Sequence, residues 1–187
     1  MLLSDYSIKH FSDVGGTLVD PFYEDHLQPC SYDVTLASKL IVFSAESSSC
    51  IKHVNAVTRD FGHVETREID MLDKGYYALS PGQFVLGSTI EKVSLPDYIA
   101  ARFEGKSSLG RMGLATHVTA GFIDAGFCGN VTLEMKNETP WYIVIAPGMR
   151  IGQLCFFELD TPARNPYGSE ILGSHYQGQI GPTPVRK

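Results

Sequence analysis

The feature that most constrains this chain is a series of short apolar stretches, separated by glycine and proline, that begins near Tyr76. Several of them alternate apolar and polar residues with a period of two, which is typical of half-buried strands. We expect these strands at residues 77–79, 84–89, 91–93, 99–103, 131–135, 142–145 and 151–158. Pro147-Gly148 lies between the last two and predicts a hairpin turn. Many short strands with turn residues between them predict an all-β barrel or sandwich.

The first part of the chain carries the one helix signal that we find. Ser4 can cap a helix whose apolar residues Ile8, Phe11 and Val14 recur at a spacing of three, and the glycine pair that follows can end it. We interpret it as a short helix that docks on the core. Further strands are expected at residues 32–36 and 39–43. The next segment, residues 44–72, is polar and irregular, and indicates a long loop or an insertion.

Composition narrows the class of protein. The chain of 187 residues is long enough for a single domain with a hydrophobic core. Its net charge of −6 argues against a nucleic-acid binder, which usually carries a basic face, but allows a local basic pocket for a nucleotide. No apolar run approaches the ~20 residues needed to cross a bilayer, and no signal peptide is visible. The four cysteines are widely spaced, so we expect free thiols and a cytoplasmic protein.

Residues that can do chemistry on a phosphate or a base gather between positions 104 and 137. Lys106 and Arg111 flank two serines, and cations combined with hydroxyl and backbone N–H donors suit an anion. The stretch is not a P-loop, because Ala100 stands where that motif requires glycine. Taken alone, it is either a phosphate site or an ordinary polar turn.

Two carboxylates further along are placed for acid–base chemistry. Asp124 lies in a predicted turn, and Glu134 lies on a predicted strand between two apolar residues. Burial on a strand brings the pKa of a glutamic acid closer to neutral pH, which suits a general acid or base. The triplet His63-Val64-Glu65 matches part of a zinc-deaminase motif, but the Pro-Cys-x-x-Cys that this chemistry also needs is absent. We therefore expect no zinc.

These blocks, in this order, resemble the dCTP deaminase family, which belongs to the wider trimeric dUTPase superfamily. The matching blocks are EGKSSLGRMGL (104–114), THVTAGFIDAGF (116–127) and VTLEMKN (131–137). The resemblance extends from about Asp20 to the tail HYQGQIGPTP, with a weak gap at residues 44–72. It implies a distorted jelly-roll β-barrel of the dUTPase-like type with a short N-terminal helix, formed by residues 1–187 as a single domain.

The resemblance also implies an enzyme that deaminates dCTP by hydrolysis without zinc. Without a metal, one carboxylate must take a proton from the attacking water and return it to the leaving ammonia. Glu134 matches the catalytic glutamate of the family, and Ser107 and Arg111 match residues that orient the water and the intermediate. Asp124 is counted with the catalytic residues and is expected to contact the deoxyribose hydroxyl.

A larger nucleotide-binding set follows from the same resemblance. Phosphates are expected on Lys106–Ser108, with Mg²⁺ carried by the triphosphate and water and with no direct protein ligand. The strand backbone beside Glu134 is expected to read the base edge. The complete set is Lys106, Ser107, Ser108, Leu109, Gly110, Arg111, Asp124, Thr132, Leu133, Glu134, Gln153, Tyr167, His175 and Gln179. The tail, residues 165–187, is either a floppy terminus or, as the family implies, a lid over the active site.

Gly121-Phe122 bears on the choice between two kinds of family member. Some only release dUTP, whereas others hydrolyse it further to dUMP and pyrophosphate, which supplies dUMP for dTTP synthesis. The Gly-Phe pair resembles the bifunctional members. Gly121 would leave room for a second water beside the α-phosphate, with Asp124 as its partner. Alternatively, Gly121 only permits a turn with positive φ.

The resemblance implies a homotrimer with sites at subunit interfaces and inhibition by dTTP, and no nucleic-acid or membrane partner. Two other functions stay open: a deaminase that only releases dUTP, and a non-catalytic nucleotide-binding trimer that regulates a partner. A plain dUTPase would leave Glu134 without a role. Two positions depart from the family pattern, since His175 replaces a usual lysine and Ala125 a usual proline. They bear on phosphate affinity and on the rigidity of the turn.

Overall fold

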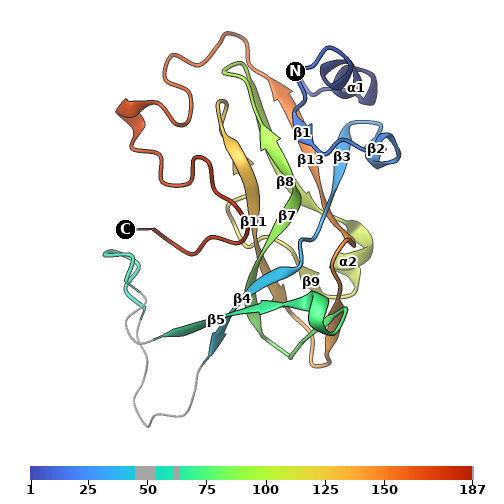
Figure 1. Ribbon diagram of the computed structural model, residues 1–187, viewed down its shortest axis with the longest axis vertical. Helices are drawn as coiled ribbons and strands as arrows, with labels where there is room; N and C mark the ends of the chain where they lie inside the picture. The colour runs from blue at the N-terminus through green and yellow to red at the C-terminus, as the bar shows by residue number, and fades with distance from the viewer. Residues whose placement is uncertain (45–53, 61–63, 187) are drawn as a thin grey trace.

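The computed structural model describes residues 1–44, 54–60 and 64–186 (Figure 1). Within these residues two large sheets and one small sheet form the fold, and all pairings are antiparallel. The six-stranded sheet contains β5 (Glu65–Asp70), β4 (Lys39–Ser44), β7 (Phe84–Ser94), β11 (Cys128–Asn137) and β9 (Leu114–Ala115), in that order, with β1 (Val19–Asp20) also paired to β7. The five-stranded sheet has the order β10 (Phe122–Ile123), β8 (Ile99–Gly105), β13 (Arg150–Glu158), β3 (Ser31–Thr35) and β2 (Leu27–Gln28). The small sheet pairs β6 (Tyr77–Leu79) with β12 (Ile143–Ile145).

Helices are short in this fold. Helix α1 (Asp5–Asp13) lies at the N-terminus, and α2 (Ser107–Arg111) follows β8. In the described residues, 3-10 turns cover Glu24–His26, Met71–Asp73 and Glu170–Leu172. The predicted all-β architecture with a short N-terminal helix is confirmed.

The hydrophobic core takes residues from both large sheets. On β11, Leu133 and Met135 are fully buried, whereas Glu134 between them is half-buried on the opposite face. On β13, Leu154 and Phe156 are fully buried in the same alternating manner. Because side chains alternate across a strand, the residues that fix β11 in the core also fix Glu134 outside it.

Helix α1 forms as its sequence predicts. The Ser4 hydroxyl accepts a hydrogen bond from the backbone N–H of Ser7 at 3.4 Å, and Ile8 is buried with Phe11 packed against the core. The expected contribution of Val14 to the docking face is wrong. The helix ends at Asp13, and Val14 lies beyond it with 64% of its surface exposed.

Strand β5 was not expected, because residues 44–72 were assigned to a loop. In the structure β5 pairs with β4 along its whole length, from Lys39↔Asp70 to Ser44↔Glu65. It is the edge strand of its sheet, and its first four residues are exposed. A charged edge strand shows no apolar alternation, so periodicity cannot detect it. Other parts of the predicted loop lie outside the described residues, as does His63 of the zinc-like triplet.

Strand β7 also differs from its prediction, since two short strands were expected in place of one long one. The register of the partner strand β11 shifts between Asn130 and Thr132, which marks a bulge. The side-chain amide of Asn130 donates hydrogen bonds to the carbonyls of Thr89, Ile90 and Glu91 at 3.1, 3.1 and 3.2 Å. This amide bridges the irregular point, so that β7 continues through it.

The hairpin expected at Pro147-Gly148 is wrong. The turn is present, with Gly148 at φ 78°, but it joins β12 to β13, which belong to different sheets. The N–H of Gly148 donates to the carbonyl of Leu36 at 2.8 Å instead of closing a hairpin. Turn residues therefore predict the change of direction but not the strand that pairs next.

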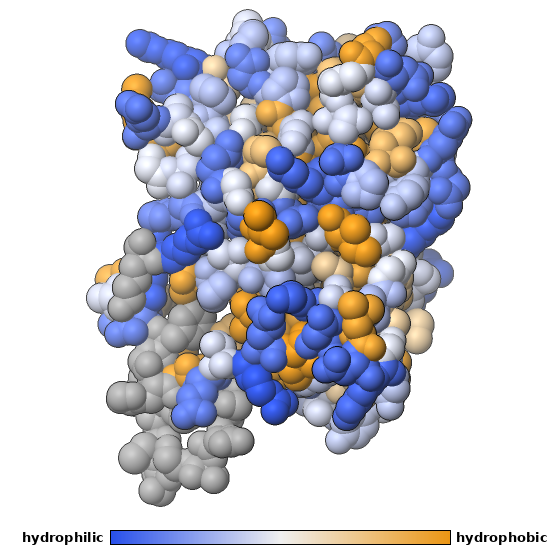
Figure 2. Space-filling model, in the orientation of Figure 1, coloured by the Kyte–Doolittle hydropathy of each residue, from blue (hydrophilic) through white to orange (hydrophobic). Residues whose placement is uncertain are grey.

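The surface and the cysteines complete the description. On the face in Figure 2, hydrophobic side chains are exposed in several separate groups among hydrophilic residues. Cys30, Cys128 and Cys155 are free thiols, as expected, and Cys50 falls outside the described residues. In the described part of the chain, no helix has the length and apolar character that crossing a membrane requires.

Candidate active site

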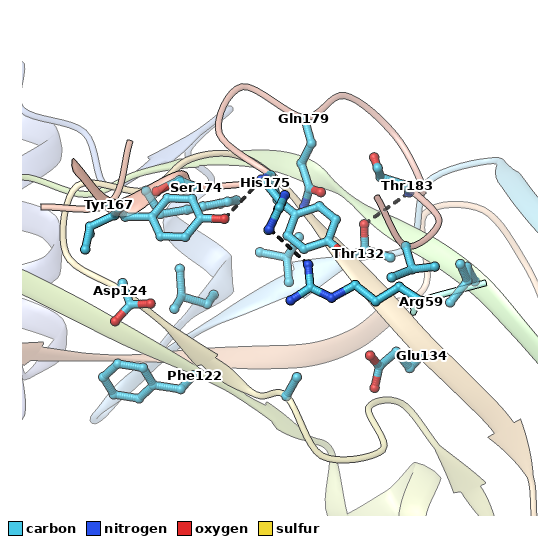
Figure 3. Close-up of a pocket in the computed structure, with 18 of the residues that line it drawn as sticks. Arg59, Phe122, Asp124, Thr132, Glu134, Tyr167, Ser174, His175, Gln179 and Thr183 are labelled. Atoms are coloured by element: carbon cyan, nitrogen blue, oxygen red, sulfur yellow. Dashed lines mark hydrogen bonds between the residues drawn. The ribbon is translucent and has the colours of Figure 1, made fainter. Parts of the chain in front are cut away.

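A cavity of about 860 Å³ opens beside β11, the turn after β10 and the C-terminal tail (Figure 3). Its lining combines apolar side chains with hydroxyl groups and two carboxylates. Seven residues that the sequence pointed to lie in this lining, namely Phe122, Asp124, Thr132, Glu134, Tyr167, His175 and Gln179. We refer to this cavity as the pocket.

Glu134 enters the pocket from β11. Its Oε2 atom accepts a hydrogen bond from the backbone N–H of Val118 at 3.2 Å. Its neighbour Leu133 has a fully buried side chain, so only the backbone of that residue could contact a ligand. One carboxylate oxygen of Glu134 is thus anchored to a loop, and the strand fixes the direction of the side chain.

Asp124 lies at the other end of the pocket, in the predicted turn after β10. The backbone N–H of Phe127 donates to the carbonyl of Asp124 at 3.1 Å, which closes the turn. Ala125, which replaces the usual proline, is buried, and its carbonyl accepts from the N–H of Tyr167 at 2.8 Å. The turn is therefore held by hydrogen bonds where a proline ring would have fixed it, and the carboxylate of Asp124 is exposed to the pocket.

The C-terminal tail forms one wall of the pocket through contacts with β11. The N–H of Gly178 donates to the carbonyl of Cys128 at 2.7 Å, and the N–H of Thr183 donates to the hydroxyl of Thr132 at 3.2 Å. Gln179 is buried, and its Nε2 atom donates to the carbonyl of Asn130 at 2.6 Å. This contact joins the tail to the strand, and Gln179 also lines the pocket.

Tyr167 and His175 project from the same tail. The hydroxyl of Tyr167 accepts a hydrogen bond from the N–H of Tyr176 at 3.0 Å. The Nε2 atom of His175 lies 2.9 Å from a guanidinium nitrogen of Arg59. Arg59 comes from residues 54–60, inside the predicted insertion, and belonged to no predicted site. In the sequence Arg59 is only a cation in a polar stretch, and that pattern does not distinguish a functional arginine from one exposed to solvent.

Gly121 has a packing role that neither sequence interpretation anticipated. Its φ is not positive, so the turn interpretation is wrong. A Cβ atom at this position would lie 2.8 Å from the backbone carbonyl of Phe103 and 3.3 Å from the ring of His117. A hydrogen bond also joins the two backbone segments, since the N–H of Phe103 donates to the carbonyl of Gly121 at 2.7 Å. Glycine is required here because β8 approaches so closely.

We predict that Gly121→Ala lowers the free energy of unfolding by about 1–3 kcal/mol, because the added methyl group meets backbone that cannot move freely. Denaturant unfolding of the purified variant measures this change. Gly16→Ala is the matched control, since its Cβ would make ordinary contacts of 3.7 Å or more. An unchanged midpoint for Gly121→Ala would contradict the packing role.

The remaining predicted residues form a second group around α2, which we call the α2 cluster (Lys106–Arg111 with Asp33 and Gln153). The Nζ atom of Lys106 lies 2.6 and 2.7 Å from the two carboxylate oxygens of Asp33, which is 1% exposed. On β13, the Oε1 atom of Gln153 accepts from the hydroxyl of Ser31 at 2.8 Å. Asp33 lies on the expected strand 32–36 and belonged to no predicted site, yet it fixes the ammonium of Lys106.

The α2 cluster and the pocket lie apart in one copy of the chain. Ser107, Ser108 and Arg111 are exposed on α2, and none of the described residues that line the pocket comes from the α2 cluster. Figure 1 shows α2 on one side of β7 and β11 and the C-terminal tail on the other. The residues predicted for one site are therefore divided between two surfaces.

Metal ligands are not clustered in the part of the chain that the structure describes. There, no three His, Cys, Asp or Glu side chains come together in a way that could hold a metal ion. Asp124 and Glu134 are the carboxylates of the pocket.

Comparisons with known proteins agree on one family. A sequence model of the dCTP deaminase-like family matches residues 2–159. Relatives named "dCTP deaminase, dUMP-forming" align with 100% of this chain: the one from Thermobifida fusca is 50% identical with 92% of its length covered, and that from Mycobacterium leprae is 47% identical with 95% covered. The crystal structure of 2'-deoxycytidine 5'-triphosphate deaminase from Agrobacterium tumefaciens matches 83% of this chain with a TM-score of 0.62 and 25% identity. The chain spans 47% of the length of that protein.

Proposed function

Because the chain belongs to the dCTP deaminase-like family, we propose that it deaminates dCTP by hydrolysis and converts the resulting dUTP to dUMP and pyrophosphate. The observation that carries this proposal is the placement of Glu134 and Asp124 in one pocket that the C-terminal tail borders. Both reactions add water to the substrate, and both need a carboxylate near the reacting atom. One pocket therefore serves both steps.

In the deamination step, Glu134 carries the proton. Its carboxylate takes a proton from the water that attacks C4 of cytosine, and the proton then goes to the leaving amino group, which departs as ammonia. The hydrogen bond from Val118 holds one oxygen of Glu134, so that the other oxygen is oriented toward the water. No zinc is needed for this step, because Glu134 performs the proton transfer itself.

In the second step, a water attacks the α-phosphate of dUTP, the bond to the β-phosphate oxygen breaks, and pyrophosphate leaves. Asp124 contacts the deoxyribose hydroxyl and orients this water. The triphosphate would carry Mg²⁺, which prefers oxygen ligands and retains several waters. When bound, it would neutralise phosphate charge, held by the triphosphate and water without a direct protein ligand.

The active form is a homotrimer in which α2 of one copy completes the pocket of another. The support is the division of the site in one chain, because exposed Ser107, Ser108 and Arg111 lie away from Glu134. In the trimer these residues orient the water, stabilise the intermediate and bind phosphates. Lys106 and Gln153 belong to the same surface, where they are held by Asp33 and Ser31.

The tail and the wider setting follow from the same proposal. Residues 165–187 act as a lid of a single dUTPase-like domain, a role supported by the hydrogen bonds that Gln179 and Thr183 make to β11. A lid excludes water other than the reacting one. dTTP carries the same deoxyribose and triphosphate groups, so it competes for the pocket and inhibits. The reaction takes place in the cytoplasm.

A second candidate function is a deaminase that releases dUTP. The packing of Gly121 against β8 removes one sequence argument for the second step and does not by itself favour this alternative. Since this glycine is required by the fold, its small size does not by itself argue for a second water.

The test of the proposal uses the full chain after washing with a chelator and addition of Mg²⁺. Ammonia release from dCTP is expected at full rate. CTP is expected to be a poor substrate, because its sugar carries a 2'-hydroxyl that dCTP lacks. Loss of ammonia release on chelation, with recovery on adding zinc, would contradict the zinc-independent mechanism.

A further inference from the structure

Residues 54–60, one of the described parts of the long polar insertion, form a tight turn beside the pocket. Asn55 and Asp60 pair in both directions, with N–H to carbonyl distances of 2.8 and 3.0 Å. The side chain of Asn55 accepts hydrogen bonds from the N–H groups of Val57 and Thr58 at 3.0 and 3.2 Å. The turn is therefore closed by its own polar groups, and it presents Arg59 at its end.

The guanidinium of Arg59 points into the pocket. In Figure 3 it lies between His175 on the tail and Glu134 on β11. One of its nitrogens is 2.9 Å from the Nε2 atom of His175. A guanidinium can only donate hydrogen bonds, so Nε2 accepts and carries no proton in this contact. The imidazole aims the side chain without neutralising its charge, so the full positive charge faces the pocket.

Charge in the pocket makes this placement important. The lining includes two carboxylates, Asp124 and Glu134, and among its described residues Arg59 is the only lysine or arginine. A nucleoside triphosphate is strongly anionic and is repelled by two carboxylates unless a cation lies close to its phosphates. Arginine is well suited to this task, because its planar donors match phosphate oxygens in pairs.

The backbone conformation of Arg59 also indicates a functional role. Its φ of 54° makes it the only residue other than glycine with a positive φ in the described chain. Glycine or asparagine adopts this conformation more easily, and other side chains are strained there. A turn that served structure alone would favour glycine at this position.

We propose that Arg59 binds the phosphate chain of the nucleoside triphosphate, so that residues 54–60 and the C-terminal tail hold the substrate from two sides. The inference rests on the proposed function, because it takes the pocket to be the triphosphate site. His175 is a positioning residue for Arg59 in this arrangement. The insertion, for which the sequence indicated no role, thereby contributes a substrate-binding residue.

The experiment compares steady-state ammonia release from dCTP with Mg²⁺ for Arg59→Gln, Arg59→Gly and a matched control, Arg67→Gln. Arg67 is an exposed arginine of β5 in the same insertion and does not line the pocket. We expect both Arg59 variants to raise KM for dCTP about tenfold with kcat changed less than about twofold, because a ground-state phosphate contact is lost. Arg67→Gln should leave both constants unchanged.

Arg59→Gly separates binding from folding. It removes the strain at φ 54°, so its melting temperature should equal or exceed that of the wild type while its KM still rises. A KM for dCTP within twofold of wild type in both Arg59 variants would overturn the proposal, as would an equal rise for Arg67→Gln. If the wild type released neither ammonia nor pyrophosphate, the proposed function would fail instead. Calorimetric titration of dCTP into wild type and Arg59→Gln would then still decide whether Arg59 binds it.

Discussion

Replacing Glu134 by glutamine should lower kcat for ammonia release from dCTP by about 10²–10⁴-fold, the range that loss of a general acid or base produces. Glutamine has nearly the same shape and can still meet the N–H of Val118 through its carbonyl oxygen, so folding should not change. It cannot accept the proton of the attacking water. Ammonia release at saturating dCTP, followed with an enzyme-coupled assay, measures the effect.

The second substrate provides the internal control for this variant. Hydrolysis of added dUTP requires no proton transfer at the base, so Glu134→Gln should retain most of its pyrophosphate release. KM for dCTP should also change little, because the glutamine occupies the same space. If ammonia release from dCTP stayed within tenfold of wild type, the assignment of Glu134 as the proton carrier would be wrong.

Mixing two inactive variants should restore activity if the site is shared between copies. Arg111→Ala removes a residue of the α2 cluster and should reduce kcat by about 10²–10³-fold, whereas Glu134→Gln inactivates the pocket. In trimers assembled from an equal mixture, about a quarter of the sites combine an intact α2 with an intact pocket, so about a quarter of wild-type activity is expected. Co-expression followed by purification of mixed trimers provides the sample.

The matched control combines Glu134→Gln with Asp124→Ala. Both residues line the same pocket, so every pocket in the mixture carries one defect and no activity should return. Mass spectrometry of the intact assemblies confirms that copies have mixed. Mixed trimers of Arg111→Ala and Glu134→Gln without recovery would show that each chain uses its own α2, and would contradict the shared site.

The strands that carry the pocket were predictable because the burial of every second side chain gives their sequences an apolar period of two. Leu133 and Met135 are fully buried in the core, and their alternation with Glu134 was visible in the sequence. Strand β5 was not predictable from periodicity. It is an edge strand that pairs with β4 alone, and its exposed residues give no apolar alternation. The all-β class follows from the first kind of strand and does not depend on the second.

The site was predicted as a set of residues but not as an arrangement. Asp33 holds Lys106 across the sheet, and Arg59 reaches His175 from 116 positions away in the chain. Such contacts depend on how loops and strands come together, and no local spacing encodes them. Gly121 illustrates the same limit, since its requirement comes from the carbonyl of Phe103 on another strand.

One time course tests the central claim most directly, namely that a single site deaminates dCTP and then releases pyrophosphate. Purified protein with Mg²⁺ is given dCTP, and ammonia, dUTP, dUMP and pyrophosphate are measured in the same samples. We predict that ammonia and pyrophosphate rise together in equal amounts, with dUMP as the nucleotide product and little free dUTP. Ammonia accompanied by an equal amount of dUTP and no pyrophosphate would contradict the account and leave a deaminase alone.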